Sequence, residues 1–310
     1  MPADHPPIQR LRRIVTGAGG IALSDALTRH LDALSKTARA STVGQRRRRV
    51  GALANALHDP LLADVTRRQL AEHLQGLTGS LKTRRDTASD LSAFFGWCRD
   101  AGLIDASPAD RLSRLVKEST RGVERDSRRP WSDAELARLM GFVDGLKATD
   151  YMRPLVMVAM YSGMRLNEIC AITDKDIEDG CFVIREAKNK NSLRRVPIHS
   201  ALLPLVEGLK GYLIPGLQPG GQDAKRGHEA SKRFGRYKRK CGFDNALVFH
   251  GLRASFIAKL ENAGVPVNIT ESIVGHRRQS MSYGVYSKGA DMKVMREAVE
   301  KVSYEGLPEI

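Results

Sequence analysis

The sequence lacks the features that would place the protein in a membrane, in an oxidising compartment or around a metal ion. It has no apolar run of about 18 residues, the length needed to span a bilayer. Residues 1–9 contain three prolines and no apolar stretch, so we expect no secretory signal and a cytoplasmic location. The four cysteines form no CxxC pair, which argues against a zinc site and a disulfide framework.

Acidic residues are scarce relative to basic ones. Asp and Glu number 35 against 50 Lys and Arg, which gives a net charge of +15 and a pI of about 9.9. An excess this large usually marks a polyanionic partner. The basic residues do not accompany a strongly apolar amphipathic segment, so nucleic acid is favoured over a membrane surface. No acidic cluster has the spacing of metal ligands, and we expect no cofactor and no metal.

The length of 310 residues allows two domains. Composition and periodicity predict an N-terminal tail, a helical domain, a polar linker, a second domain and a C-terminal helix. Their bounds are 1–23, 24–116, 117–130, 131–290 and 291–310. The predicted fold is mainly α with a small antiparallel β-sheet.

The helical domain shows apolar residues at helical spacing in four stretches. These lie at about 24–34, 42–57, 64–77 and 80–101. We expect Ser24 and Asp25 to cap the first helix. The second contains four consecutive arginines, Arg46 to Arg49. An isolated run of this kind is usually a solvated helix face, but the net charge favours contact with phosphates.

The second domain begins with Ser132 and Glu135, which have the spacing of a capping box. Residues 154–161 are apolar all round and predict a buried helix. Turn residues separate three expected strands, near 176–177, 181–185 and 194–198. Residues 225–240 contain eight basic residues and one acid. We expect this segment to form a helix that packs through Phe234 and Tyr237 and presents its basic face to DNA.

The stretch from His250 to Tyr286 contains the residues best suited to phosphate chemistry. His250 and Arg253 are i and i+3 at the start of a predicted helix, where the helix dipole favours an anion. Gly275 ends a second predicted helix at 267–274 and presents His276. Tyr286 follows ten positions after that histidine (286 − 276 = 10).

Two earlier features complete the pattern. Ser162-Gly163 precedes Arg165, and Glu168 lies three residues further on, where it either holds the arginine or forms an ordinary surface pair. Lys188 and Lys190 lie in the turn between two predicted strands.

In order and spacing, these residues resemble the tyrosine recombinase (phage integrase) family. The family signature is T/S-G-x-R-x-x-E, a lysine in a β-hairpin, H-x-x-R, G-H and a nucleophilic tyrosine. The resemblance covers roughly residues 24 to 300 and implies two domains that form a clamp around DNA, a helical core-binding domain and a catalytic domain. The implied catalytic residues are Arg165, Lys188, His250, Arg253, His276 and Tyr286.

The resemblance also implies their roles. The arginines would stabilise charge on the phosphoryl group, the histidines would donate to it, and the lysine would protonate the leaving oxygen. Lys188 is favoured over Lys190 because family hairpins place the lysine just after the strand. Tyr286 is favoured over Tyr283 because the family tyrosine sits nine or ten residues after the histidine.

The implied function is a site-specific recombinase acting as a homotetramer on double-stranded DNA. Accessory DNA-bending or directionality proteins are candidate partners, and no membrane is involved. The sequence Tyr-Gly-Val-Tyr-Ser favours integration or excision of a prophage or mobile element. The alternatives are a chromosome-dimer resolvase, a type IB topoisomerase-like enzyme, or a DNA-binding protein of the same fold without strand exchange.

The C-terminal helix carries an apolar seam at i, i+3, i+7 and i+10, formed by Met292, Met295, Val299 and Val302. Such a seam either folds back on its own domain or docks on a neighbouring protomer. The resemblance favours docking, as the family's C-terminal helices do in cyclic tetramers.

Overall fold

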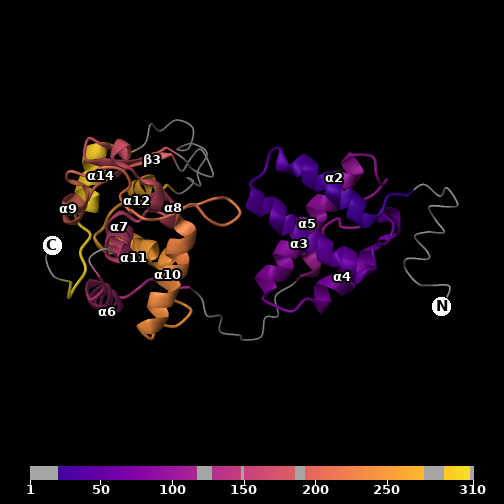
Figure 1. Cartoon of the computed structure of the whole chain (residues 1–310), viewed down its shortest axis with the longest axis horizontal. Coiled ribbons are helices and arrows are strands. Elements are labelled where there is room, and N and C mark those ends of the chain that lie inside the picture. Colours follow the sequence, from indigo (N-terminus) through magenta and orange to yellow (C-terminus); the bar gives the residue numbers. More distant parts are fainter. Residues whose placement is uncertain (1–19, 117–127, 148–149, 186–192, 276–289, 308–310) are drawn as a thin grey trace. The chain divides into compact units, whose positions relative to one another are not determined.

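The structure, a computed structural model, describes residues 20–116, 128–147, 150–185, 193–275 and 290–307. The chain divides into two compact units, Met1–Gly122 and Val123–Ile310 (Figure 1). The division falls inside residues 117–130, where the sequence predicts a linker.

The first unit is a helical bundle built around one long central helix. Its helices are α2 (Leu23–Ser35), α3 (Ala40–Ala56), α4 (Arg67–Gly76) and α5 (Leu81–Asp100), with short turns η1 (Leu62–Asp64) and η2 (Leu112–Leu115). Helix α5 packs against the other three helices and η2. It contributes Phe94 and Phe95, both fully buried, to the centre of the core.

Helix caps in this unit differ in part from the prediction. Helix α2 begins at Leu23, so Ser24 lies inside the helix and the predicted cap is wrong. Ser24 N and Oγ instead donate to the Asp59 carboxylate at 2.9 and 2.8 Å, which ties α2 to the turn after α3. Helix α4 has a capping box formed by Thr66 and Gln69.

The arginine run on α3 is divided between the core and the surface. Arg46 is buried, and its Nε donates to the Asp90 carboxylate at 3.0 Å. Arg49 also pairs with Asp90. Asp90 thus pairs with two of the four arginines, and the expected contact of this run with phosphates stays a prediction. Arg47 and Arg48 are exposed.

The second unit is mainly helical with a three-stranded antiparallel sheet of order β1-β2-β3, which confirms the predicted fold class. Its helices are α6 (Asp133–Asp144), α7 (Met152–Ser162), α8 (Leu166–Ala171), α9 (Leu203–Val206), α10 (Gly227–Lys240), α11 (Phe249–Asn262), α12 (Val267–Val274) and α14 (Met292–Val299). Its strands and short turns are η3 (Asp174–Asp176), β1 (Ile177–Glu178), β2 (Cys181–Ile184), β3 (Arg194–Pro197) and η5 (Ser200–Leu202).

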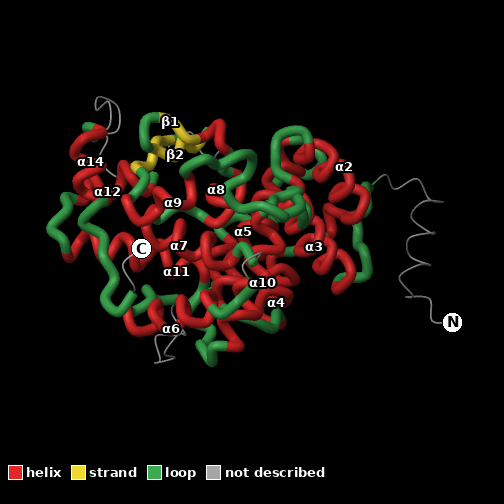
Figure 2. Tube along the Cα trace, turned by 60° about the vertical axis from the view of Figure 1, so that its left-hand side comes forward, coloured by secondary structure: helices red, strands yellow, loops and turns green. Residues whose placement is uncertain are grey.

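Helix α7 forms the centre of this unit. It is buried along nearly its whole length, as its all-apolar sequence predicts, and it packs against α6, α8 and α11. The small sheet lies at one edge of the helices (Figure 2), where β3 contacts α12 and α14. Ser132 and Glu135 form the predicted capping box at the start of α6.

The C-terminal helix packs on its own unit. Met295, Val299 and Val302 are buried in the same core as α7. Beyond the helix, Tyr304 is buried, and its Oη donates to Met160 O at 2.7 Å. The apolar seam is thus buried against the rest of its own unit. The prediction that it docks on a neighbouring protomer is therefore wrong.

No helix within the described residues is long and apolar enough to cross a membrane.

Candidate active site

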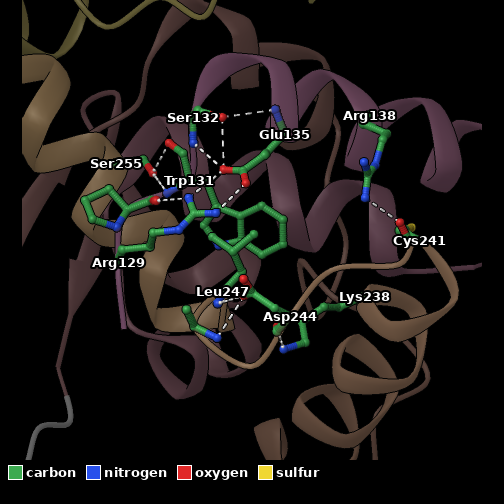
Figure 3. A network of polar contacts seen from close by, with 12 residues as sticks. Arg129, Trp131, Ser132, Glu135, Arg138, Lys238, Cys241, Asp244, Leu247 and Ser255 are labelled. Carbon is green, nitrogen blue, oxygen red and sulfur yellow. Dashed lines mark hydrogen bonds and ion pairs between the residues drawn. The ribbon is translucent and has the colours of Figure 1, made fainter. Parts of the chain in front are cut away.

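The start of α11 is fixed by the chain that enters the second unit. Trp131 N donates to Ser255 Oγ at 2.7 Å, and Ser255 Oγ donates back to Trp131 O at 2.9 Å (Figure 3). The Trp131 indole donates to Val248 O at 3.0 Å. A Cβ at Gly251 would lie 2.9 Å from Arg129 O and 3.0 Å from the indole, so only glycine fits this crossing. These contacts set the helix turn that carries His250 and Arg253.

Arg253 lies one turn into α11 and joins two other helix ends. Its Nη1 donates to Gly163 O and its Nη2 to Val274 O, both at 2.7 Å. Gly163 ends α7 with φ of 60°, and a Cβ there would lie 2.4 Å from the Phe256 ring. Arg253 is only 2% exposed. The ends of α7 and α12 are therefore brought together by a buried cation.

Arg165 is held by Glu168, as one of the two sequence interpretations proposed. Arg165 N donates to Glu168 Oε2 at 2.8 Å, and Arg165 Nη1 donates to Oε1 at 2.7 Å. The Glu168 side chain is 7% exposed while that of Arg165 is 37% exposed. This is not an ordinary surface pair, because the carboxylate is buried and the guanidinium reaches from it towards solvent.

A third arginine, Arg194, belongs to the cluster and was not predicted. Its Nη1 and Nη2 donate to the two oxygens of Glu168 at 3.2 and 2.9 Å, and its Nε donates to Ile273 O at 2.7 Å. The sequence contained one signal: Arg194 lies two residues before the buried Val196, so strand alternation places both on the same face.

The cluster carries an excess of positive charge. Arg165 and Arg194 pair with the Glu168 carboxylate, and Arg253 lies close enough to interact with it electrostatically. Burial raises the pKa of Glu168, but the bonds from Arg194 and Arg165 outweigh it, and the net pKa lies below the ordinary value. Burial, with Arg165 and Arg194 nearby, lowers the pKa of Arg253 to about 9, so the group still carries its charge at neutral pH. Such a cluster favours an anionic ligand.

His250 is neutral at pH 7 in this setting. His250 is exposed, but partial loss of solvent around its imidazole lowers its pKa below the ordinary value of 6.5, and the positive charges of Arg253, Arg165 and Arg128 lower it further. A neutral imidazole can donate one hydrogen bond and accept a proton.

The remaining predicted residues, Lys188, Lys190, His276, Tyr283 and Tyr286, lie outside the described residues. Strand β2 ends before the two lysines in the sequence, and strand β3 begins after them. Gly275 is the last described residue before His276, and it ends α12 with φ of 71°. Of the six predicted catalytic residues, the structure thus brings together Arg165, His250 and Arg253. Across the described part of the chain, no cluster of three or more His, Cys, Asp or Glu could hold a metal ion.

The basic helix α10 presents a narrower charged face than its sequence suggests. Phe234 is buried and Tyr237 is half-buried, as predicted. Lys238 is buried and donates to Asp244 O, and Arg233 pairs with Asp150 at 3.1 Å. The exposed basic residues of the helix are Lys232, Arg236, Arg239 and Lys240.

Most of the second unit matches a known protein family. Residues 132–292 match the model of the phage integrase family. The matched segment contains the start of α6, the arginine cluster, and both expected histidines and tyrosines. The chain belongs to the phage integrase family of tyrosine recombinases.

Individual relatives are distant. The chain is 21% identical to a XerC-like tyrosine recombinase of Caldanaerobacter subterraneus, over 67% of this chain and 62% of that protein. It is 23% identical to a tyrosine recombinase of Pseudothermotoga lettingae, over 80% of this chain and 86% of that protein. The chain thus spans less than two thirds of the first relative and most of the second.

The fold is similar to that of lambda integrase, solved as a dimer bound to a COC′ core site. The TM-score is 0.67 at 18% identity, and the match covers 91% of this chain and 83% of that one.

Proposed function

We propose that this chain is a site-specific recombinase that cuts DNA through a covalent 3′-phosphotyrosyl intermediate, and that it integrates or excises a prophage or mobile element. The observation that carries the proposal is the pairing of Arg165 and Arg194 with one buried carboxylate, together with Arg253, which bonds the same end of α12 as they do. A site with this surplus of positive charge suits a phosphodiester.

The proposed cleavage step is a transfer between two oxygens. The Tyr286 hydroxyl attacks the scissile phosphorus, a bond forms between its Oη and the phosphorus, and the bond to the 5′-oxygen breaks. Lys188 supplies the proton that the leaving 5′-oxygen takes up. The tyrosine proton passes to a histidine, and His250 can accept it because a neutral imidazole has one ring nitrogen with a free lone pair. Attack by another 5′-hydroxyl reverses the step and joins new ends.

The arginines act on the charge that the phosphoryl group gathers during this step. Arg165 projects from the Glu168 carboxylate with 37% of its side chain exposed, so a phosphate oxygen can reach it. Planar guanidinium groups match the geometry of phosphate oxygens. By analogy with arginine fingers, removal of such an arginine would slow cleavage on the order of 10³-fold.

DNA binding is assigned to the exposed basic residues of each unit. In the first unit these include Arg47 and Arg48 on α3. In the second they include the exposed face of α10. A homotetramer on double-stranded DNA is part of the proposal, with accessory proteins as further partners.

A second candidate, a chromosome-dimer resolvase, is favoured by the XerC-like relative. The two roles predict different cutting sites. A mobile-element integrase cuts at the ends of its own element and at an insertion site, whereas a resolvase cuts at one chromosomal site.

Mapping covalent protein–DNA junctions tests the proposal. The full chain is incubated with genomic DNA of its host, the adducts are isolated under denaturing conditions, and the attached ends are sequenced. Discrete junctions joined through a 3′-phosphate are expected from the wild type, and none from Tyr286→Phe. Adducts at scattered positions would indicate a topoisomerase-like activity, and binding without adducts would indicate a protein that only occupies its site.

A further inference from the structure

Three consecutive carbonyls at the C-terminal end of α12 each accept a hydrogen bond from a different arginine. The pairs are Arg194 Nε with Ile273 O (2.7 Å), Arg253 Nη2 with Val274 O (2.7 Å) and Arg165 Nη2 with Gly275 O (3.3 Å). The last carbonyls of a helix lack intrahelical partners and lie at the negative end of its dipole, so cations bind there favourably. Two of these arginines belong to the predicted catalytic set, and Arg194 does not.

Arg194 is placed to act on its neighbours and not on a phosphate. Its side chain is 6% exposed, and all three of its guanidinium nitrogens donate to protein acceptors. The Arg165 side chain, which shares the Glu168 carboxylate with it, is 37% exposed. Arg194 is thus the inner partner of the carboxylate and Arg165 the outer one.

This arrangement has an electrostatic consequence for Arg165. A buried carboxylate is costly unless a cation pairs with it, and the nearest cation makes this pair. Because Arg194 already pairs with both oxygens of Glu168, the charge of Arg165 is not fully cancelled and stays available to an anion. Without Arg194, the carboxylate would draw Arg165 inwards and weaken its attraction for a phosphate.

Arg194 also shapes the turn that leads to His276. A Cβ at Gly275 would lie 2.9 Å from Arg194 Cδ and 3.0 Å from its Nη1. Gly275 has φ of 71°, which favours glycine independently. The side chain therefore packs directly on the last described residue before the predicted catalytic histidine.

We propose that Arg194 is a positioning residue for phosphate cleavage. It neutralises Glu168 so that the charge of Arg165 is directed at the phosphate, and it fixes the end of α12 from which the chain continues to His276. This inference rests on the proposed function. The competing interpretation is a buried ion pair that only stabilises the fold.

The test compares two substrates in single-turnover cleavage at saturating protein. Both are nicked suicide oligonucleotides spanning a junction mapped as above. One carries the natural phosphodiester at the scissile position and the other a methylphosphonate, in which a methyl group replaces one charged oxygen. The variants are Arg194→Met and Arg194→Lys, with Arg195→Met as the matched control. Arg195 is the next residue of β3, and its Nη2 pairs with Asp179 at 2.8 Å, away from the cluster.

On the phosphodiester, Arg194→Met is expected to slow cleavage by about 10²-fold, the size expected for a catalytic group displaced by about 1 Å. Half-site binding should be unchanged, and Arg195→Met should cleave like the wild type. The transition state of the methylphosphonate carries less charge for an arginine to stabilise. On this substrate, the ratio of the wild-type cleavage rate to the Arg194→Met rate should therefore be smaller than on the phosphodiester.

Equal slowing on both substrates would assign Arg194 a purely structural role and overturn the proposal. If Arg194→Met fails to fold in thermal unfolding, Arg194→Lys carries the test, because lysine keeps a buried cation but cannot bond both Glu168 oxygens and Ile273 O in this geometry. Cleavage by Arg194→Lys at the wild-type rate would also overturn it. Absence of cleavage by the wild type would instead refute the proposed function.

Discussion

Trp131 and Ser255 are 124 residues apart in sequence, yet each donates a hydrogen bond to the other: Trp131 N to Ser255 Oγ and Ser255 Oγ to Trp131 O. Both groups are buried. The pair closes the second unit by joining the chain that enters α6 to the helix that carries His250 and Arg253.

Ser255→Ala should therefore reduce both stability and cleavage. The buried Trp131 N–H loses its acceptor, which costs about 1–3 kcal/mol. The control is Ser272→Ala, which removes a half-buried serine that bonds the carbonyl four residues earlier, as Ser255 also does. Urea unfolding and suicide-substrate cleavage measure the two effects. If Ser255→Ala behaves like the control in both assays, the pair does not position α11.

The nucleophile is tested by two tyrosine variants. Tyr286→Phe should abolish covalent complexes with nicked suicide substrates and leave DNA binding near normal, because only the hydroxyl is removed. Tyr283→Phe is the matched control and should keep activity. Loss of adducts in the Tyr283 variant alone would move the assignment to that residue.

The leaving-group acid is tested with a substrate whose 5′-bridging oxygen is replaced by sulfur. A thiolate leaves without needing a proton, so this substrate should restore cleavage by Lys188→Ala. The control is Lys190→Ala, which should cleave the normal substrate well. If the sulfur-containing substrate instead restores cleavage by Lys190→Ala, and Lys188→Ala cleaves the normal substrate, then Lys190 is the leaving-group acid.

The exposed arginines of α3 are tested by the salt dependence of binding. Replacing Arg47 and Arg48 by Ala should weaken binding and flatten the slope of log K against log salt by about 0.9 for each phosphate that the variant no longer neutralises. Arg46→Ala should instead lower stability, because it leaves Asp90 with one partner fewer in the bundle. An unchanged slope in the double variant would show that α3 does not contact phosphates.

The stability of the first unit should fall in mild acid because of His30. Burial and the nearby charge of Arg46 lower the pKa of His30 from 6.5 to about 4, although the charge of Asp90 acts in the opposite direction. Between these values the unfolded chain binds a proton that the folded chain does not, so stability falls as pH drops from 6.5 towards 4. The shift of 2.5 units (6.5 − 4) corresponds to at most about 3.5 kcal/mol at roughly 1.4 kcal/mol per unit.

Urea unfolding of the full chain across this pH range measures the effect. His30→Gln should flatten the dependence, since its side chain does not titrate. His58→Asn is the control, because His58 is exposed and asparagine tolerates its positive φ. A dependence as steep in His30→Gln as in the wild type would rule out His30 as the source.

Sequence patterns predicted local structure well and long-range ion pairs poorly. The helix Val267–Val274 and the Ser132–Glu135 capping box depend on neighbours within a few residues, so their signals are complete in the sequence. Arg46 and Arg194 have carboxylate partners 44 and 26 residues away. A local pattern cannot show which arginine of a run faces such a partner, and both roles became visible only in the fold.

The packing of the C-terminal helix limits where the predicted nucleophile can go. Helix α14 packs on α12 and on β3. Helix α12 ends just before Gly275, and β3 begins at Arg194. Gly275 and Ala290, the described residues on either side of His276 and Tyr286, therefore lie in the same unit. Tyr286 is four residues from Ala290, a span of at most about 14 Å. The covalent reach from Ala290 therefore bounds how far the backbone of the predicted nucleophile can lie from this unit.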